Sequence, residues 1–238
     1  MEQVSTILKA SFVAITLIAV WQFYRASNKS KAFLIIAFVL STIQLFIGQT
    51  NFYENENTIP PRFILLIVPA IVLIVIIFAT NKGRRFIDNL NLKQLTLLHT
   101  IRIPVEIILY FLFISKAVPQ IMTFEGSNFD ILAGVTAPLI FYFSFIKKIS
   151  VSILLVWNFI SLGLLINIII LATLSAKTPF QQFAFDQPNI AIGHFPFNWL
   201  PSIIVPIVLL SHFATIRQLI VEQKKTTANN DLAKNWLT

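Results

Sequence analysis

The stretch from Asn91 to Lys116, NLKQLTLLHTIRIPVEIILYFLFISK, limits the possible folds of this chain most strongly. It is apolar and long enough to cross a bilayer, which takes about 20 residues of helix. Unlike the other apolar stretches, it carries a run of polar side chains in its middle: His99, Arg102, Glu106 and Tyr110. At about 100° per residue these four fall within an arc of about 80°, so they share one face of a helix. The sequence therefore predicts a membrane helix with one polar face.

This polar face is a candidate functional site. Arg102 and Glu106 have the i,i+4 spacing that predicts an ion pair. A charge at the centre of a membrane helix costs about 2.5 to 3.5 kcal/mol on insertion scales, so the face should contact protein or a wet cavity. Pro104, between the two charges, removes a backbone hydrogen bond and predicts a kink with a free acceptor at Thr100.

Composition indicates a membrane protein along the whole chain. Apolar residues make up 56% and charged residues 12% of the 238 residues, and the mean hydropathy is +0.79, outside the range of a soluble domain. The net charge of +8 comes from basic residues scattered over short loops. Membrane orientation explains such a pattern, so the lipid bilayer is the expected partner and nucleic acid is not. With no cysteine, the chain has no disulfide, thiolate nucleophile or Cys-ligated metal.

Apolar segments alternate with polar connections along the sequence. We expect helices at residues 5–24, 32–49, 62–80, 91–115, 131–145, 151–173 and 199–217. The predicted fold is an all-α integral membrane protein, a seven-transmembrane-helix bundle. Residues 1–217 form this single domain, and residues 218–238 form a polar cytoplasmic tail.

Positive charges are unevenly divided between the two sets of connections. Most lysines and arginines lie in residues 25–31, 81–93, 147–148 and 217–238, and the other side has Lys9, Arg62, Lys116 and Lys177. Basic loops stay in the cytoplasm, so we expect an outside N-terminus and a cytoplasmic C-terminus. The expected location is the plasma (inner) membrane.

Single polar residues on other helices are expected to join the polar face. With this topology Asn158 and His212 lie about 8 to 12 Å from the cytoplasmic side, close to the depth of His99, and Tyr142 is near the same level. These groups would line a cavity that opens inward. The alternative is that each histidine bonds a backbone carbonyl or a hydroxyl and only links helices. Gln44 is either a hydrogen-bonded packing residue or a ligand contact.

The predicted outer loops hold a second group of residues with metal-binding chemistry, His194, Asp186, Glu125 and Asp130. Their spacings match no metal motif, so solvated loop charges are the expected explanation and no metal site is predicted. The sequence identifies no cofactor.

Seven helices with an outside N-terminus resemble microbial rhodopsins and receptors of the G-protein-coupled type in topology. The last predicted helix, WLPSIIVPIVLLSHFATIR, has no lysine for a retinal Schiff base. Transmembrane hydrolases of the alkaline ceramidase and progestin-receptor group are similar in topology, but their last helix carries two histidines and this one carries only His212. Small sugar transporters share the length and orientation, yet the polar face has no repeat elsewhere in this chain. No family motif matches.

Two functions remain open from the sequence. The first is a small-molecule or proton-coupled transporter, or a ligand-binding membrane protein, in which Glu106 is the coupling group and Arg102 keeps it ionised or binds an anionic ligand. The second is an intramembrane enzyme in which His99 or His212 acts with Glu106 as a general base or metal ligand. A variant of the second function has a haem held between the two histidines.

Overall fold

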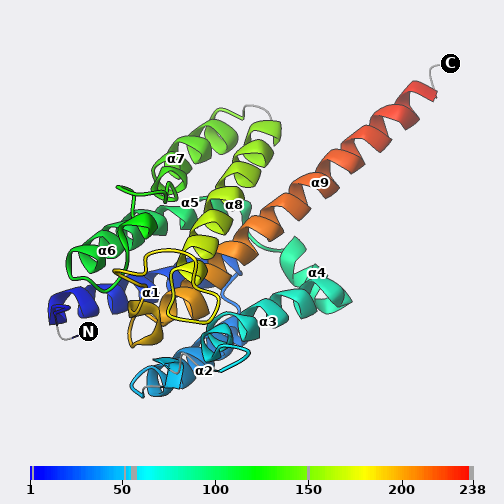
Figure 1. Cartoon of the computed structure of the whole chain (residues 1–238). Coiled ribbons are helices and arrows are strands. Elements are labelled where there is room, and N and C mark those ends of the chain that lie inside the picture. The colour runs from blue at the N-terminus through cyan, green and yellow to red at the C-terminus, as the bar shows by residue number, and fades with distance from the viewer. Residues whose placement is uncertain (2, 51, 55–57, 149–150, 236–238) are drawn as a thin grey trace.

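The computed structural model describes residues 1, 3–50, 52–54, 58–148 and 151–235, with side chains up to residue 224. This part of the chain is helical and contains no β-strand. The helices pack into one bundle, and the last helix, α9, projects from it toward the C-terminus (Figure 1).

The described chain contains α1 (Thr6–Ala26), α2 (Lys31–Ile47), α3 (Val68–Ala79), α4 (Asn81–Asp88), α5 (Leu92–Leu98), α6 (Arg102–Ile114), α7 (Ile131–Phe141), α8 (Val151–Leu174) and α9 (Val205–Asn235). Short 3₁₀ turns lie at Phe52–Glu54, Arg62–Leu66, His99–Ile101, Gln120–Met122 and Ala191–Gly193. Two π-helical turns, Tyr142–Ile146 and Leu200–Ile204, continue α7 and precede α9.

Four helical stretches are long and apolar enough to cross a membrane: Thr6–Ala26, Leu92–Ile114, Val151–Leu174 and Leu200–Lys224. Each reaches the length of about 20 residues that a bilayer requires. Three further apolar helices, α2, α3 and α7 with its π turn, are shorter. The chain is therefore an all-α membrane protein, as its composition predicts.

One end of the bundle is closed by α4, and we call it the α4 end. The guanidinium of Arg217 on α9 lies 2.9 Å from the carboxylate of Asp88 on α4. Next to this pair, the amide of Gln218 donates hydrogen bonds to the carbonyls of Ile87 and Leu90. These contacts hold α9 against the short basic helix.

The loops formed by residues 48–50, 52–54 and 58–67, by residues 115–130 and by residues 175–199 meet at the other end, the loop end. The backbone N–H of Phe195 donates to the carbonyl of Gly48, and the N–H of Ile190 donates to that of Ala117. Buried loop backbone must find such partners because water is excluded. The three loops therefore form one cap over the bundle.

The membrane segment with the polar face is interrupted in its middle. The side chain of Asn91 accepts a hydrogen bond from the N–H of Gln94, so the predicted helix start at Asn91 is confirmed. The helix then tightens into the 3₁₀ turn His99–Ile101 before α6 begins at Arg102. This break lies in the turn before Pro104, where the sequence predicts a kink.

The C-terminal segment is helical. Residues 218–235 continue α9 without a break, and the sequence predicts a polar, weakly helical tail from residue 218. No proline or glycine follows Arg217 within α9, so nothing in the chain stops the helix there. The last residues of the predicted tail, 236–238, lie outside the described residues.

Candidate functional site

Arg102 is the centre of a buried polar cluster. Its side chain is 3% exposed, and its Nη1 donates to Oδ1 of Asp130 at 2.9 Å and to the carbonyl of Ser161 at 3.1 Å. Its Nη2 donates to Nε2 of His212 at 2.7 Å. Since these partners come from the start of α7, from α8 and from α9, one guanidinium joins four helices.

The predicted ion pair between Arg102 and Glu106 is wrong, because Arg102 pairs with Asp130. Side chains on a helix point back toward its N-terminus, so the guanidinium extends away from the position four residues later. An arginine that precedes the acid by four residues is also the weaker order for such a pair. Asp130, predicted as a solvated loop charge, is 4% exposed.

Glu106 is buried on the next turn of α6 and is held through Asn128. Its Oε2 accepts a hydrogen bond from Nδ2 of Asn128 at 2.7 Å, and its Oε1 has no hydrogen-bond partner among the described residues. The same Nδ2 donates to the carbonyl of Met122, and Oδ1 of Asn128 accepts from the N–H of Asp130. One asparagine therefore holds both the carboxyl group of Glu106 and the backbone of Asp130.

The loop between α6 and α7 enters the bundle. Asp130 contacts the first residue of α6, which lies about 18 Å from the far end of that helix at Ile114. Irregular backbone at membrane depth is tolerated where protein buries it, and Asn128 and Thr123 are fully buried. The sequence places this whole segment in an outer loop, which is why its part in the site was not predicted.

His212 is held as a neutral imidazole by its two neighbours. Arginine can only donate, so Nε2 of His212 accepts from Arg102. Nδ1 therefore carries the proton and donates to Oδ1 of Asn158 at 2.9 Å, while Nδ2 of Asn158 donates to the carbonyl of Leu154. A continuous chain of hydrogen bonds thus runs from Asp130 through Arg102 and His212 to α8.

His99 packs beside this chain. Its ring stacks on that of His212 with centroids 4.1 Å apart and meets the edge of Trp157. The hydroxyl of Ser211 donates to the carbonyl of Val208 and so accepts from Nε2 of His99 at 3.1 Å. Nδ1 of His99 is buried without a hydrogen-bond partner in the part of the chain that the structure describes.

A glycine allows α7 to approach the cluster. An added Cβ at Gly134 would lie 2.9 Å from Cγ1 of Ile103 and 3.2 Å from Cβ of Arg102. Ala133 and Ala137 are buried on the same helix. Small residues let membrane helices pack closely, and here they bring the start of α7 against Arg102.

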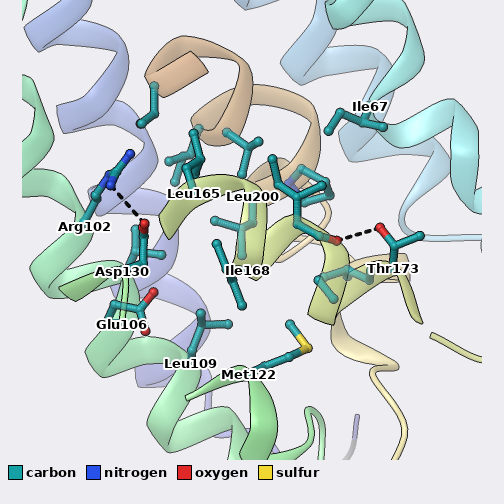
Figure 2. Close-up of a pocket in the computed structure, with 18 of the residues that line it drawn as sticks. Ile67, Arg102, Glu106, Leu109, Met122, Asp130, Leu165, Ile168, Thr173 and Leu200 are labelled. Carbon is teal, nitrogen blue, oxygen red and sulfur yellow. Dashed lines mark hydrogen bonds and ion pairs between the residues drawn. The ribbon is translucent and has the colours of Figure 1, made fainter. Parts of the chain in front are cut away.

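An apolar cleft begins at this cluster. Its empty volume is about 750 Å³ including the open mouth, and Arg102, Glu106 and Asp130 lie at one end (Figure 2). The walls are mainly aliphatic side chains of α6, α8, α9 and the segment before α3, and Ile67 and Thr173 lie at the far end. Phe63 and Ile192 also line a second cavity at the loop end, so the two spaces are neighbours.

The cleft lies on the side of Arg102 away from the histidines. The sequence predicts a cavity lined by His99, Asn158 and His212, but these three are buried, at most 1% exposed, and none of them lines the cleft. Stacked rings fill the predicted space. The inward-opening cavity is therefore wrong as a description of this structure.

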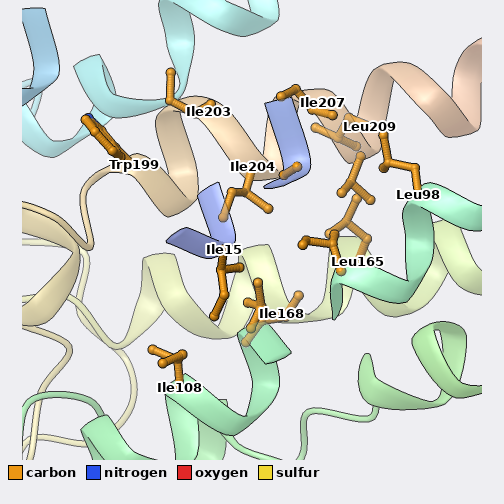
Figure 3. Packing of buried hydrophobic residues seen from close by; sticks show 14 of the residues in the cluster. Ile15, Leu98, Ile108, Leu165, Ile168, Trp199, Ile203, Ile204, Ile207 and Leu209 are labelled. Atoms are coloured by element: carbon orange, nitrogen blue, oxygen red, sulfur yellow. The ribbon is translucent and has the colours of Figure 1, made fainter. Parts of the chain in front are cut away.

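The inner walls of the cleft belong to the main apolar core. Ile204, Leu165 and Ile168 line the cleft and also pack with Ile15 and Ile108 of neighbouring helices (Figure 3). Two thirds of the α9 span, 67%, is buried against 28% of the α1 span, so α9 is the central helix. Close-packed walls of this kind keep the cleft at a fixed shape.

Two predicted site residues lie outside the cluster. Tyr110 stacks on Phe124 of the following loop, with ring centroids 5.1 Å apart. Tyr142 is 42% exposed and lies under the ammonium group of Lys147. Both are aromatic contacts at the edges of the bundle and do not line the cleft.

Gln44 is also separate from the cluster. Its side-chain oxygen accepts a hydrogen bond from the hydroxyl of Tyr53 at 2.8 Å, and its backbone carbonyl accepts from Asn198. Burial raises the pKa of the Tyr53 hydroxyl, which keeps it a donor. This geometry matches the packing role that the sequence offers as one of two alternatives for Gln44.

The arrangement does not fit the metal and haem hypotheses. The described residues contain no group of three potential metal ligands, and Asp130 is buried beside Arg102, away from the exposed side chains of Glu125 and Asp186. The rings of His99 and His212 are stacked face to face with centroids 4.1 Å apart, so a haem does not fit between them, and both Nε2 atoms already have partners. No axial pair for a haem is formed.

Three groups in the cluster are absent from the predicted site: Asn128, Asp130 and the carbonyl of Ser161. Spacing along the chain does not reveal them, because they are at least 22 residues from their partners. The one available signal is the sequence Asn-x-Asp directly before an apolar helix, which is typical of an Asx turn.

A family model described as "Domain of unknown function (DUF8737)" matches residues 59–220. This match covers more than half of the chain and includes every residue of the cluster and the lining of the cleft. No curated protein matches the chain. No solved structure matches it either.

Proposed function

The chain belongs to the DUF8737 family, and we propose that it is a proton-coupled transporter or ligand-binding membrane protein for a small amphipathic molecule. The ligand occupies the cleft between α6, α8 and α9. Glu106 holds a proton while the cleft is empty and releases it to water at the open mouth of the cleft when the ligand arrives. The observation that carries this proposal is an apolar cleft that ends at a buried carboxyl with one free oxygen.

The form of the cleft supports a small ligand. Binding sites for small molecules have volumes of about 300 to 1,000 Å³, apolar walls and a few polar groups at fixed positions. The cleft has this size and this distribution of side chains. Its neighbour at the loop end, lined by Tyr53, Glu54 and His194, offers an approach past Phe63 and Ile192.

Arg102 serves as a fixed support in this proposal. Both terminal nitrogens of its guanidinium are used by Asp130, Ser161 and His212. The positive charge of the guanidinium is already paired with Asp130, so we do not assign Arg102 to an anionic ligand. It keeps Asp130 ionised and fixes the helices around the cleft.

The proposal places seven helical segments across the plasma (inner) membrane, with the N-terminus outside. The four long and three shorter apolar helices supply the segments. The loop end has few basic residues, whereas the α4 end has Lys82, Arg84, Arg85 and Arg217. This distribution supports a cytoplasmic α4 end.

The intramembrane enzyme remains a second hypothesis with less support. A general base needs a free nitrogen near the substrate. Nε2 of His212 accepts from Arg102, and neither His212 nor His99 lines the cleft. We therefore assign the histidines to the support of Arg102.

Photolabelling tests the proposed site. The purified protein in lipid nanodiscs is irradiated with a neutral n-alkanol that carries a diazirine, and mass spectrometry locates the crosslinks. We expect labels on cleft residues such as Leu165 and Ile168, and we expect Val105→Trp to remove them because Val105 lines the cleft. Ile107→Trp is the control, since Ile107 is on the same helix but 44% exposed on the outside.

A second pair of variants guards against misfolding of Val105→Trp. Ala172→Trp fills the cleft from α8, and Ile170→Trp adds the same bulk on the exposed face of α8. Loss of the cleft labels in both filling variants and their retention in both controls supports the site. Labels confined to lipid-facing residues in the unmodified protein would refute it.

A further inference from the structure

The charges at the end of the cleft are unbalanced. The cleft is lined by one cationic side chain, Arg102, and by two carboxyl groups, Asp130 and Glu106. Arg102 and Asp130 neutralise each other at 2.9 Å. His212, which also contacts Arg102, is neutral because it accepts from the guanidinium and donates to Asn158. One carboxyl group, Glu106, is thus left without a counter-charge.

Glu106 presents a free acceptor to the cleft. The residue is 1% exposed, its Oε2 is bonded to Asn128, and its Oε1 has no partner within the described part of the chain. A buried ionised carboxylate is costly unless a cation or hydrogen-bond donor meets it. Among the described residues, the donors left at this end of the cleft are the Nε–H and the second Nη2 hydrogen of Arg102, whose positive charge is already paired with Asp130.

We infer that the ligand is a lipophilic cation, an amine with a single apolar chain or small apolar body whose ammonium group lies against Glu106. This inference rests on the proposed function, because it names the class of molecule that the same cleft takes. The aliphatic walls hold the apolar part, and the ammonium N–H donates to Oε1 of Glu106. The positive charge takes the place of the proton, so the net charge at the end of the cleft does not change.

The geometry disfavours an anionic head group of the same size. A carboxylate in this position would lie beside Glu106 and Asp130, and two like charges in an apolar site repel strongly. Asp130, Ser161 and His212 already occupy three of the five N–H groups of the guanidinium, and Asp130 already matches its charge. A neutral alcohol can donate to Glu106 but does not replace the missing positive charge.

Competition against the photolabel tests this inference. Dodecylammonium and dodecanoate share one chain length and differ in the charge of the head group, and each competes with the diazirine alkanol in zwitterionic nanodiscs. Their concentrations are corrected for partition into empty nanodiscs. We expect dodecylammonium to halve cleft labelling at a concentration at least about tenfold below that of dodecanoate, the ratio expected from one lost ion pair.

Variants of Glu106 test whether this residue causes the preference of the cleft for dodecylammonium over dodecanoate. The Glu106→Gln variant should still take the alkanol label, but dodecylammonium and dodecanoate should compete with that label equally well. In Glu106→Asp, dodecylammonium should remain the better competitor. Equal or better competition by dodecanoate in the unmodified protein, or an ammonium preference that survives in Glu106→Gln, overturns the inference and leaves the cleft as a binding site. Absence of alkanol labels from the cleft overturns the proposed function itself.

Discussion

Oδ1 of Asp130 lies 2.9 Å from Nη1 of Arg102, although the two residues are 28 positions apart and both side chains are buried. The contact joins the start of α7 to the start of α6 and places the irregular segment before α7 inside the bundle. Glu106, the one carboxyl side chain of α6, is thereby free to face the cleft.

Removal of Asp130 should strongly destabilise the fold. Asp130→Ala leaves a buried guanidinium without its counter-charge, which costs about 3 to 5 kcal/mol in the free energy of unfolding. Asp88→Ala removes the surface partner of Arg217 and should cost at most about 1 kcal/mol. Denaturant titration in mixed micelles measures both values. Equal losses in the free energy of unfolding for Asp130→Ala and Asp88→Ala would contradict the structural role of the buried Asp130–Arg102 pair.

Close approach of α7 to Arg102 predicts a difference between two helix glycines. A Cβ at Gly134 would meet Ile103 and Arg102 within 3.2 Å, whereas a Cβ at Gly163 of α8 meets no atom within 4 Å. Gly134→Ala should lower the free energy of unfolding by about 1 to 3 kcal/mol. Gly163→Ala should raise it by about 0.5 to 1 kcal/mol through helix propensity. The reverse order would refute the described packing.

Substitution of His212 should lower the stability of the protein but leave the ligand site intact. His212→Phe leaves Nη2 of Arg102 and Oδ1 of Asn158 without their partner, so we expect a loss of about 1 to 3 kcal/mol in the free energy of unfolding. The folded fraction of this variant should still take the alkanol label in the cleft. Loss of that label from correctly folded protein would favour a direct role of His212 toward the ligand.

Orientation can be measured because the chain has no cysteine. Ser127, at the loop end, and Lys82, at the α4 end, are both exposed. An impermeant thiol reagent added to intact cells should label Ser127→Cys and leave Lys82→Cys unlabelled. Gly83 is a poorer position, since a side chain there would meet the backbone of Ile77. Labelling of Lys82→Cys alone would invert the proposed topology.

Hydrophobic patterning predicts the apolar helices because length and apolar content determine them, and four of the seven expected spans are long and apolar enough to cross a membrane. The cap at Asn91 marks the start of α5, whereas α4 lies where the sequence predicts a basic connection. Beyond Arg217 the sequence predicts only weak helical character, because propensity alone is weak over a polar segment, whereas α9 continues to Asn235. Two contacts at the α4 end, from Arg217 and Gln218, hold the junction.

The candidate site was only partly predictable. Helical periodicity correctly placed His99, Arg102 and Glu106 at buried positions, and depth arguments brought Asn158 and His212 to them. The partner of Arg102 was missed because a loop that re-enters the bundle leaves no periodic pattern. Three predicted site residues are polar but lie outside the cluster: Tyr110, Tyr142 and Gln44. The sequence cannot show this separation, because it depends on how the helices pack.

The central claim is that Glu106 exchanges its proton for the ligand, and infrared difference spectroscopy tests it most directly. Spectra of the protein in nanodiscs are recorded before and after addition of dodecylammonium. We expect the carbonyl band of one protonated carboxylic acid to disappear in the unmodified protein and to be absent from Glu106→Gln throughout. The assignment of Glu106 would be contradicted by an unchanged spectrum at a dodecylammonium concentration that fully suppresses cleft labelling. The same band loss in Glu106→Gln would also contradict it.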